Sequence, residues 1–276
     1  MTASAPTLPP IAFIGGGNMA SAIIGGLVQR GLPASQIEVV EPFEPARAAL
    51  LHNFGITAQP QASDALARAA LVVWAVKPQT FKEATAAVRP HTSAALHLSV
   101  AAGIPTDSIA RWLGTQNIVR AMPNTPALVG QGITGLFACP QVNAQSKALV
   151  EQVIATTGQF VWVGAEEQLD AVTALSGSGP AYVFLFLEAM TQAGVDMGLP
   201  AAQAYQLAVA TFQGASQLAA QSPDSAEVLR QRVTSKGGTT HAAITHLQAA
   251  QVPQHFIAAM RAAQARAREL AAEFGA

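Results

Sequence analysis

The feature that most constrains the fold is a glycine-rich turn directly after the first apolar run. Residues 11–14 read Ile-Ala-Phe-Ile, and Gly15-Gly-Gly-Asn-Met-Ala20 follows. Gly15, Gly17 and Ala20 fit the pattern G-x-G-x-x-G/A, in which the first glycine permits the turn, the second lets a pyrophosphate approach, and the last small residue allows helix and strand to pack. A helix that begins near Asn18 and Met19 would offer free N–H groups to phosphates. This turn predicts a dinucleotide site.

Short apolar runs alternate with helical patterns through the first half of the chain. This alternation predicts a Rossmann-like α/β fold, with a doubly wound parallel sheet covered on both faces. We expect this domain to bind the dinucleotide over residues 11–164, after a disordered leader at residues 1–10. Strands are predicted at 11–15, 37–40, 71–76, 96–100, 118–121, 132–138 and 160–163, and helices at 18–30 and 44–53.

After Gly164 no strand pattern recurs, and apolar residues fall near helical spacing. We predict an all-α domain over residues 165–276, with one helix opened by Pro200 and a last helix over residues 254–274. Charges are scarce between Ala171 and Ala220. So apolar a helical half predicts burial against another chain, which indicates a homo-oligomer.

Composition excludes several classes of function. The net charge of the 276 residues is -1 without a basic stripe, so we expect no nucleic-acid partner. The apolar run at 181–187 is far shorter than the roughly 20 residues of a membrane span, so we expect no membrane partner. One cysteine, Cys139, fits a reducing compartment and a cytoplasmic location. His241 and His246 are five positions apart, which does not place two ligands on one helix face, and we expect no metal site.

Glu41 ends the predicted second strand, where an acidic residue can bind the adenosine ribose hydroxyls of NAD and repel the extra phosphate of NADP. Arg47, a little over one helical turn later, could still meet that phosphate. The alternative is that Glu41 is a solvated strand end. The sequence therefore leaves NADPH and NADH open as cofactors.

Two further strand ends are expected at the same edge of the sheet, because ligands of doubly wound sheets sit beyond the carboxyl ends of the strands. They are Ala75-Val-Lys-Pro78 and Ser99-Val-Ala-Ala-Gly103. The alternative is that each segment is an ordinary turn from a strand into a loop. For Ser99 taken alone, the sequence does not reject this alternative. The expected cofactor contacts are Ala75, Val76, Lys77, Pro78, Ala101 and Ala102.

Six blocks in order, spanning nearly the whole chain, resemble those of the pyrroline-5-carboxylate reductases. The last three in particular form a specific set. They are Gly15-Gly-Gly-Asn-Met-Ala20, Ala75-Val-Lys-Pro78, Ser99-Val-Ala-Ala-Gly103, Arg120-Ala-Met-Pro-Asn-Thr-Pro126, Ala174-Leu-Ser-Gly-Ser-Gly-Pro-Ala-Tyr182 and Val233-Thr-Ser-Lys-Gly-Gly-Thr-Thr240.

The resemblance implies a Rossmann-like domain followed by a helical domain that dimerises. It implies NAD(P)H-dependent reduction of 1-pyrroline-5-carboxylate to L-proline, the last step of proline biosynthesis. It also implies an active site between the cofactor domain and the dimer-forming helices, and rings of dimers up to a decamer.

The block Ser235-Lys-Gly-Gly-Thr-Thr240 can supply an anion pocket, because successive glycines expose N–H groups that bind carboxylates. The alternative is a turn that caps a helix, and both roles can hold at once. Lys236 stands where the family usually has proline, and we expect it to point to solvent. In the other block, Pro180 predicts a helix kink.

The resemblance implies a role for each remaining site residue. Thr240 is the candidate hydrogen-bond donor to the ring nitrogen and, with Lys77, the candidate catalytic residue. Pro123 and Asn124 are expected to touch the cofactor. The expected substrate contacts are Met122, Asn124, Thr173, Ser176, Ser178, Ser235, Gly237, Gly238, Thr239 and Thr240.

The sequence departs from the family pattern at two places, and it leaves rival functions open. Gln59-Pro-Gln-Ala62 lacks the family's cofactor-binding asparagine, and Ser225-Ala226 replaces its usual His-Pro pair. An imine reductase or hydroxyacid dehydrogenase would be expected to carry a catalytic lysine or aspartate where Ser176-Gly-Ser-Gly-Pro180 stands. A nucleotide-sensing or scaffold protein is the non-enzyme alternative.

Overall fold

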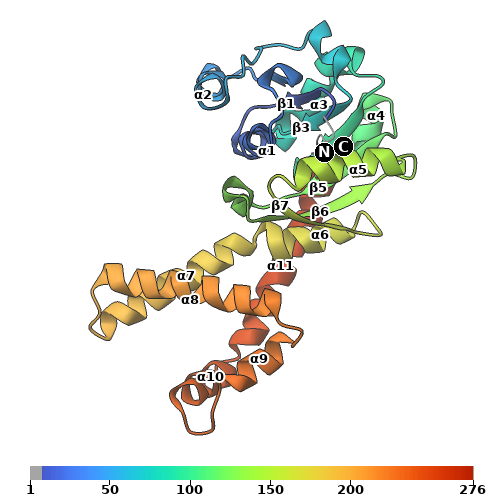
Figure 1. Cartoon of the computed structure of the whole chain (residues 1–276). Helices are drawn as coiled ribbons and strands as arrows, with labels where there is room; N and C mark the ends of the chain where they lie inside the picture. Colours follow the sequence, from blue (N-terminus) through green and yellow to red (C-terminus); the bar gives the residue numbers. More distant parts are fainter. Residues whose placement is uncertain (1–7, 276) are drawn as a thin grey trace, which may run out of the picture. The chain divides into compact units, whose positions relative to one another are not determined.

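The computed structural model describes residues 8–275 of the chain (Figure 1). Two compact units are present. The first unit contains the chain up to Ser178 and again from Ala263 onward, and the second unit is Gly179–Ala262. The predicted leader lies mostly outside the described residues, and β1 begins at Ile11. The domain ranges 11–164 and 165–276, predicted from the end of the strand pattern at Gly164, stay a prediction.

A single seven-stranded sheet forms the centre of the first unit, in the order β2-β1-β3-β4-β5-β6-β7. Both β1 and β3 are wholly buried apolar runs, as expected of strands covered on both faces. The predicted strands are confirmed, with ends that differ by at most two residues. They are β1 Ile11–Ile14, β2 Ile37–Val40, β3 Leu71–Trp74, β4 Leu96–Ser99, β5 Ile118–Met122, β6 Gly132–Ala138 and β7 Gly158–Trp162.

The predicted doubly wound parallel sheet is confirmed, with one antiparallel pair that was not expected. Strand β6 runs antiparallel to β5, with Met122 opposite Gly135, whereas every other pair is parallel. A parallel crossover needs about a dozen residues or more. Residues 123–131 between β5 and β6 contain only the short η4 (Thr125–Val129), so the chain turns back along the edge of β5.

Helices connect the strands of this unit. Helices α1 and α5 contact each other, and so do α3 and α4; Figure 1 shows the two pairs on opposite sides of the sheet. The helices are α1 Asn18–Gln29, α2 Glu44–Phe54, α3 Pro78–Val88, α4 Thr106–Leu113, α5 Ala144–Ile154 and α6 Gln168–Val172. Short 3₁₀ turns occur at η1 Ala34–Gln36, η2 Asp64–Arg68 and η3 Arg89–His91, and η5 Thr173–Gly177 is a π-helix.

The second unit is helical, as predicted. It contains α7 Gly179–Asp196, α8 Ala201–Gln221, α9 Ala226–Arg232, α10 Thr239–Ala249 and the first part of α11 Val252–Phe274. Pro200 is the N-cap of α8. At the start of α11, Phe256 packs against Tyr182 and Phe186, with ring centroids 5.5 and 5.8 Å apart.

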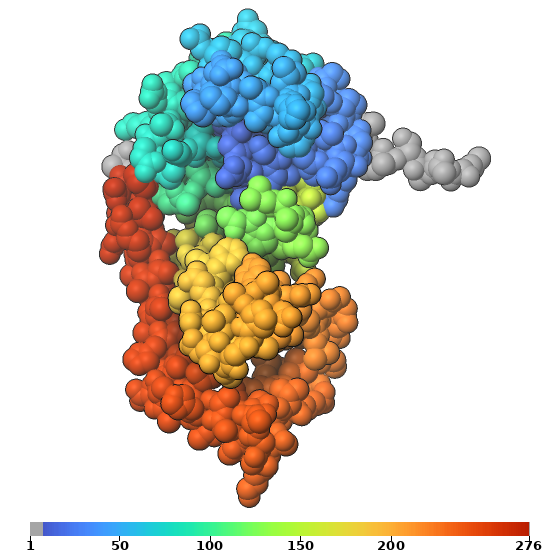
Figure 2. Space-filling model, turned by 90° about the vertical axis from the view of Figure 1, so that its left-hand side faces the viewer, coloured from blue at the N-terminus to red at the C-terminus, as the bar shows by residue number. Residues whose placement is uncertain are grey.

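Large apolar side chains lie open on α7 and α8, which form the yellow and orange surface facing the viewer in Figure 2. Few side chains of these helices are buried: Leu187 on α7, and Ala204 and Ala208 on α8. Helices this apolar need a surface to cover them. The more exposed residues on the two helices are Phe184, Leu185, Tyr205, Leu207 and Leu218, all more than 55% exposed, and Met197 in the loop between them is 79% exposed.

Residues 8–275 contain no helix that is both long and apolar enough to cross a membrane.

A buried aromatic cluster holds β3 and β4 together. The indole N–H of Trp74 donates to Nδ1 of His97 over 3.0 Å, and the Trp74 ring stacks on Phe81 at 5.0 Å. Burial lowers the pKa of His97 from 6.5 to about 4, against a smaller opposite effect of the hydrogen bond to the Thr92 backbone. His97 is therefore neutral in the folded chain and accepts the indole proton.

We predict that His97 makes the protein less stable as the pH falls. The unfolded chain takes up this proton near pH 6.5 and the folded chain only near pH 4, so protonation favours unfolding across that interval. The free energy of unfolding should fall by up to about 1.4 kcal/mol per pH unit below pH 6.5. Urea denaturation at several pH values measures the slope.

The variant His97→Gln should lose this part of the slope, because glutamine does not titrate. Its side-chain oxygen can still accept the hydrogen bond from Trp74. His52→Gln, at an exposed position on α2, is the control and should keep it. An unchanged slope in His97→Gln would contradict the assignment.

Candidate active site

The glycine turn is built by close backbone contact between two strand ends. Gly15 has a φ of +95°, and a Cβ placed on it would lie 2.5 Å from the carbonyl oxygen of Ala75. Its N–H donates to Val40 O over 2.8 Å, so β2 also holds this turn. The tight bend predicted for Gly15 is confirmed, since only glycine fits there without strain.

Gly17 lies at the open side of the same turn. A Cβ on Gly17 would meet nothing within 4 Å. Gly17 is the N-cap of α1, and no side chain caps that end of the helix. Asn18 is exposed, Met19 is partly buried, and Ala20 is fully buried where α1 packs on the sheet. Uncapped N–H groups beside open space fit a bound pyrophosphate.

Strand register places the other predicted segments at the same edge. Ile14 pairs with Trp74 and Trp74 with Ser99, so the residues after each strand come level with Gly15. Lys77 is the exposed N-cap of α3, and Pro78 is its first residue. Along this edge Ala75 and Val76 are partly buried, Ala101 is buried and Ala102 is exposed. Ser99 itself is fully buried and accepts the N–H of Ala101 at 3.4 Å, which is a structural role.

Asn124 links three segments of the sheet unit. Its Nδ2 donates to the carbonyl oxygen of Ser176 over 3.2 Å, and its Oδ1 accepts the N–H of Ile133 over 3.0 Å. The side chain is 9% exposed. Both ends of the amide are thus occupied by protein, and Asn124 fixes the π-helix η5 against β6.

The π-helix places its small residues against the strand end. The N–H of Ser178 donates to Thr173 O over 2.8 Å, a bond that spans five residues. A Cβ on Gly177 would lie 2.6 Å from Cε of Met122. The predicted kink is confirmed as a π turn, a feature frequent at functional sites. Met122 and Asn124 therefore lie beside the segment that contains Thr173, Ser176 and Ser178, and the contact of these residues with substrate stays a prediction.

The hydroxyls of this segment are turned to their own helix. Thr173 Oγ1 donates to Leu169 O over 2.7 Å, and Ser176 Oγ donates to Val172 O over 3.0 Å. Each oxygen keeps its capacity to accept.

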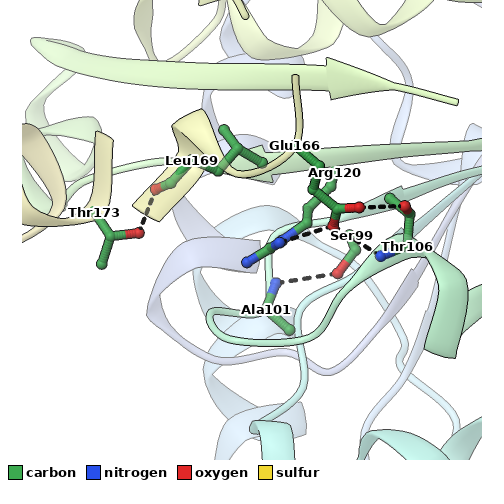
Figure 3. Close-up of polar contacts among 7 residues, drawn as sticks. All are labelled: Ser99, Ala101, Thr106, Arg120, Glu166, Leu169 and Thr173. Atoms are coloured by element: carbon green, nitrogen blue, oxygen red, sulfur yellow. Dashed lines mark hydrogen bonds and ion pairs between the residues drawn. The ribbon is translucent and has the colours of Figure 1, made fainter. Parts of the chain in front are cut away.

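A buried charge network was missed by sequence reasoning. Arg120, 6% exposed on β5, donates to Glu166 over 2.8 Å, and the same carboxylate accepts the N–H of Thr106 over 2.8 Å and its hydroxyl (Figure 3). Glu166 thus caps α4 from a distant loop. Burial raises the pKa of nearby Asp170, and Arg120 and Arg268 partly oppose this. The available signal was an arginine within the otherwise apolar run of β5.

The glycine–threonine block lies in the helical unit. The N–H of Gly238 donates to Ser235 O over 3.0 Å, Gly237 has a φ of +76°, and α10 begins at Thr239 with no side-chain cap. A helix-opening turn with free N–H groups is therefore present, and both earlier interpretations of the block remain compatible with it. Thr240 is partly buried, and Lys236 is exposed as expected.

The doubly wound sheet with its glycine turn defines the class of Rossmann-type dinucleotide-binding proteins. Residues 166–270 match the dimerisation region of pyrroline-5-carboxylate reductase, and residues 10–103 match the family described as NADP oxidoreductase, coenzyme F420-dependent.

The pyrroline-5-carboxylate reductase of Pseudomonas aeruginosa is 45% identical over 97% of this chain and 98% of its own length. The Coxiella burnetii enzyme structure has a TM-score of 0.89 and 39% identity, covering 95% of this chain and 98% of that one. The Plasmodium falciparum pyrroline carboxylate reductase with NADP bound has a TM-score of 0.85 and 26% identity, covering 97% of this chain and 100% of that one. The chain belongs to the pyrroline-5-carboxylate reductase family.

We predict that two glycines of the turn respond differently to alanine. Gly15→Ala should lower the free energy of unfolding by more than about 1 kcal/mol, because of its positive φ and the Ala75 oxygen. Gly17→Ala should change it by less than about 0.5 kcal/mol but weaken dinucleotide binding, since the methyl group enters the open space. Denaturation and calorimetry with NADH measure the two effects. Equal destabilisation by both would contradict this division of roles.

We predict that Asn124→Asp lowers the free energy of unfolding by about 1–3 kcal/mol, because the donor to Ser176 O becomes an acceptor in a buried place. Asn53→Asp, at an exposed position on α2, is the matched control and should have little effect. Thermal and urea unfolding measure both. A loss no larger than that of the control would show that the bridge contributes nothing.

Proposed function

We propose that this chain reduces 1-pyrroline-5-carboxylate to L-proline with NADH or NADPH, the last step of proline biosynthesis. The observation that carries the proposal is the 45% identity over nearly the full length to the Pseudomonas aeruginosa reductase. It covers both the glycine turn and the glycine–threonine block, so it extends beyond the cofactor domain.

The chemistry of the substrate sets the tasks of the site. A small ring with a carboxylate and a C=N bond needs an anion pocket, a donor at nitrogen and a hydride donor at the imine carbon. Bound NADH or NADPH supplies the hydride. The imine nitrogen is basic enough to bind protonated or to take a proton from water, so turnover depends mainly on positioning.

The proposed substrate residues bind and orient. The N–H groups of Gly237 and Thr239 hold the carboxylate together with the Ser235 hydroxyl, since such turns and helix starts attract anions. Gly238, whose own N–H donates to Ser235 O, shapes the turn around the carboxylate. The hydroxyl of Thr240 hydrogen-bonds to the ring nitrogen: it donates to the neutral imine and accepts the N–H of the protonated one. The remaining walls are Met122, Asn124, Thr173, Ser176 and Ser178.

The proposed cofactor residues lie on the sheet domain, residues 11–164. Lys77 supplies positive charge beyond the carboxyl ends of the strands. It is the second catalytic residue that we propose. The complete set is Gly15, Gly17, Asn18, Met19, Ala20, Glu41, Ala75, Val76, Lys77, Pro78, Ala101, Ala102, Pro123 and Asn124.

The helical domain, residues 165–276, is proposed to form a homodimer. The exposed apolar side chains of α7 and α8 support this, as does the match of residues 166–270 to a dimerisation region. We further propose that dimers assemble into a ring such as a decamer. Light scattering measures the mass of the assembly. A cytoplasmic location is proposed from the lone, buried Cys139.

We predict that the purified protein oxidises NADH or NADPH when given 1-pyrroline-5-carboxylate. The assay follows absorbance of the reduced nicotinamide with each cofactor at saturating substrate. No turnover with either cofactor would exclude the proposed activity.

Within the same assay, Thr240→Ala should lower turnover by about tenfold to a hundredfold, the value of one hydrogen bond to a charged group. Cofactor affinity should change far less. Thr245→Ala on the same helix is the control, and Thr240→Ser should restore turnover. Equal losses in turnover and cofactor affinity would argue against a role at the substrate.

A further inference from the structure

Glu41, at the end of β2, is fixed by hydrogen bonds to the backbone of its neighbours. Its carboxylate accepts the N–H of Gly16 over 2.7 Å and the N–H of Phe43 over 2.8 Å. Its own N–H donates to Gln59 O over 2.8 Å. Glu41 is therefore not a freely solvated strand end, and its negative charge has a fixed place beside the glycine turn.

The glycine turn is shaped to admit this carboxylate. A Cβ on Gly16 would lie 2.7 Å from Leu50 Cδ1 and 3.3 Å from Glu41 Cγ. Gly16 is buried between these two side chains, whereas Gly17 next to it is open. There is thus no room for a side chain at position 16. Because Gly16 has none, the Glu41 carboxylate can reach the backbone of the turn.

The nearby cation does not neutralise Glu41. Nη1 of Arg47 donates to two backbone carbonyls, Glu41 O over 3.0 Å and Pro42 O over 2.6 Å. Within residues 8–275, no ion pair involves the Glu41 carboxylate. Arg47 thus supports the bend after β2 and leaves the charge of Glu41 in place.

We propose that Glu41 makes this protein select NADH over NADPH. In Rossmann sites an acidic residue here accepts hydrogen bonds from the adenosine ribose, and NADPH carries a phosphate on the 2′-oxygen of that ribose. A phosphate group adds about 1.5 to 2 negative charges, which would lie against a carboxylate that the backbone keeps from moving away. The inference rests on the cofactor part of the proposed function and deepens it.

The test is direct binding to the full-length protein without imine substrate, by calorimetry with NADH and NADPH. The wild type should bind NADPH at least about tenfold more weakly than NADH. Raising the potassium chloride concentration should narrow this ratio, because salt screens the repulsion. Equal or tighter binding of NADPH would overturn the proposal, and so would a ratio that widens with salt.

Variants assign the effect to Glu41. In Glu41→Gln and Glu41→Ser the ratio should fall toward one, mainly through tighter NADPH binding. Glu44→Gln removes the same charge three residues later on α2 and should leave the ratio unchanged. Circular dichroism shows whether each variant is folded, and a folded Glu41 variant that keeps the wild-type ratio overturns the proposal.

Arg47→Ala separates the rival explanation. If the Arg47 guanidinium bound the 2′-phosphate, this variant would lose NADPH selectively, a result that contradicts our proposal. If Arg47 only supports the bend, both cofactors should weaken to the same degree. Binding of neither cofactor by the wild type would refute the dinucleotide site itself, whereas missing reductase activity alone would leave these ratios intact.

Discussion

The close approach of the Gly15 backbone to the carbonyl of Ala75 is the constraint on which the carboxyl ends of the strands depend. Because a Cβ would come within 2.5 Å of that oxygen, β1 and β3 can end together only with glycine at this point. The parallel register then brings the ends of β4 and β5 to the same level. The residues that we propose for the cofactor come from separate parts of the sequence, and they lie at one level of the sheet because Gly15 has no side chain.

A second constraint joins this edge to the start of the helical segment. Asn124 satisfies a carbonyl in the π-helix and an N–H at β6, so the turn after β5 and the π-helix keep one arrangement. Glu166 does the same for β5 and the start of α4, with Arg120 as its buried partner. These polar side chains act as fixed links within the sheet unit, since a buried amide or carboxylate is costly unless it is bonded.

The helical unit depends on a different principle. Its helices bury few of their own apolar side chains, while Phe184 and Leu185 stay open on α7. A unit with so small a core of its own gains stability mainly by covering such faces with another surface. The low charge of this part of the sequence and its match to a dimerisation region agree with such a surface.

The sequence by itself determined the doubly wound class, the glycine turn, the helical second half and the family, because apolar periodicity and the glycine pattern are local signals. The antiparallel direction of β6 was not predicted, although the short connection over residues 123–131 favours it, because the apolar pattern of a strand carries no information on its direction. Nor could the sequence show that Asn124 is engaged at both ends, or that Glu166 pairs with Arg120 46 residues away. The surroundings of Glu41 were likewise decided only by tertiary structure, because Gly16 and Gln59 reach it from other segments, and such contacts leave no periodic trace in a sequence.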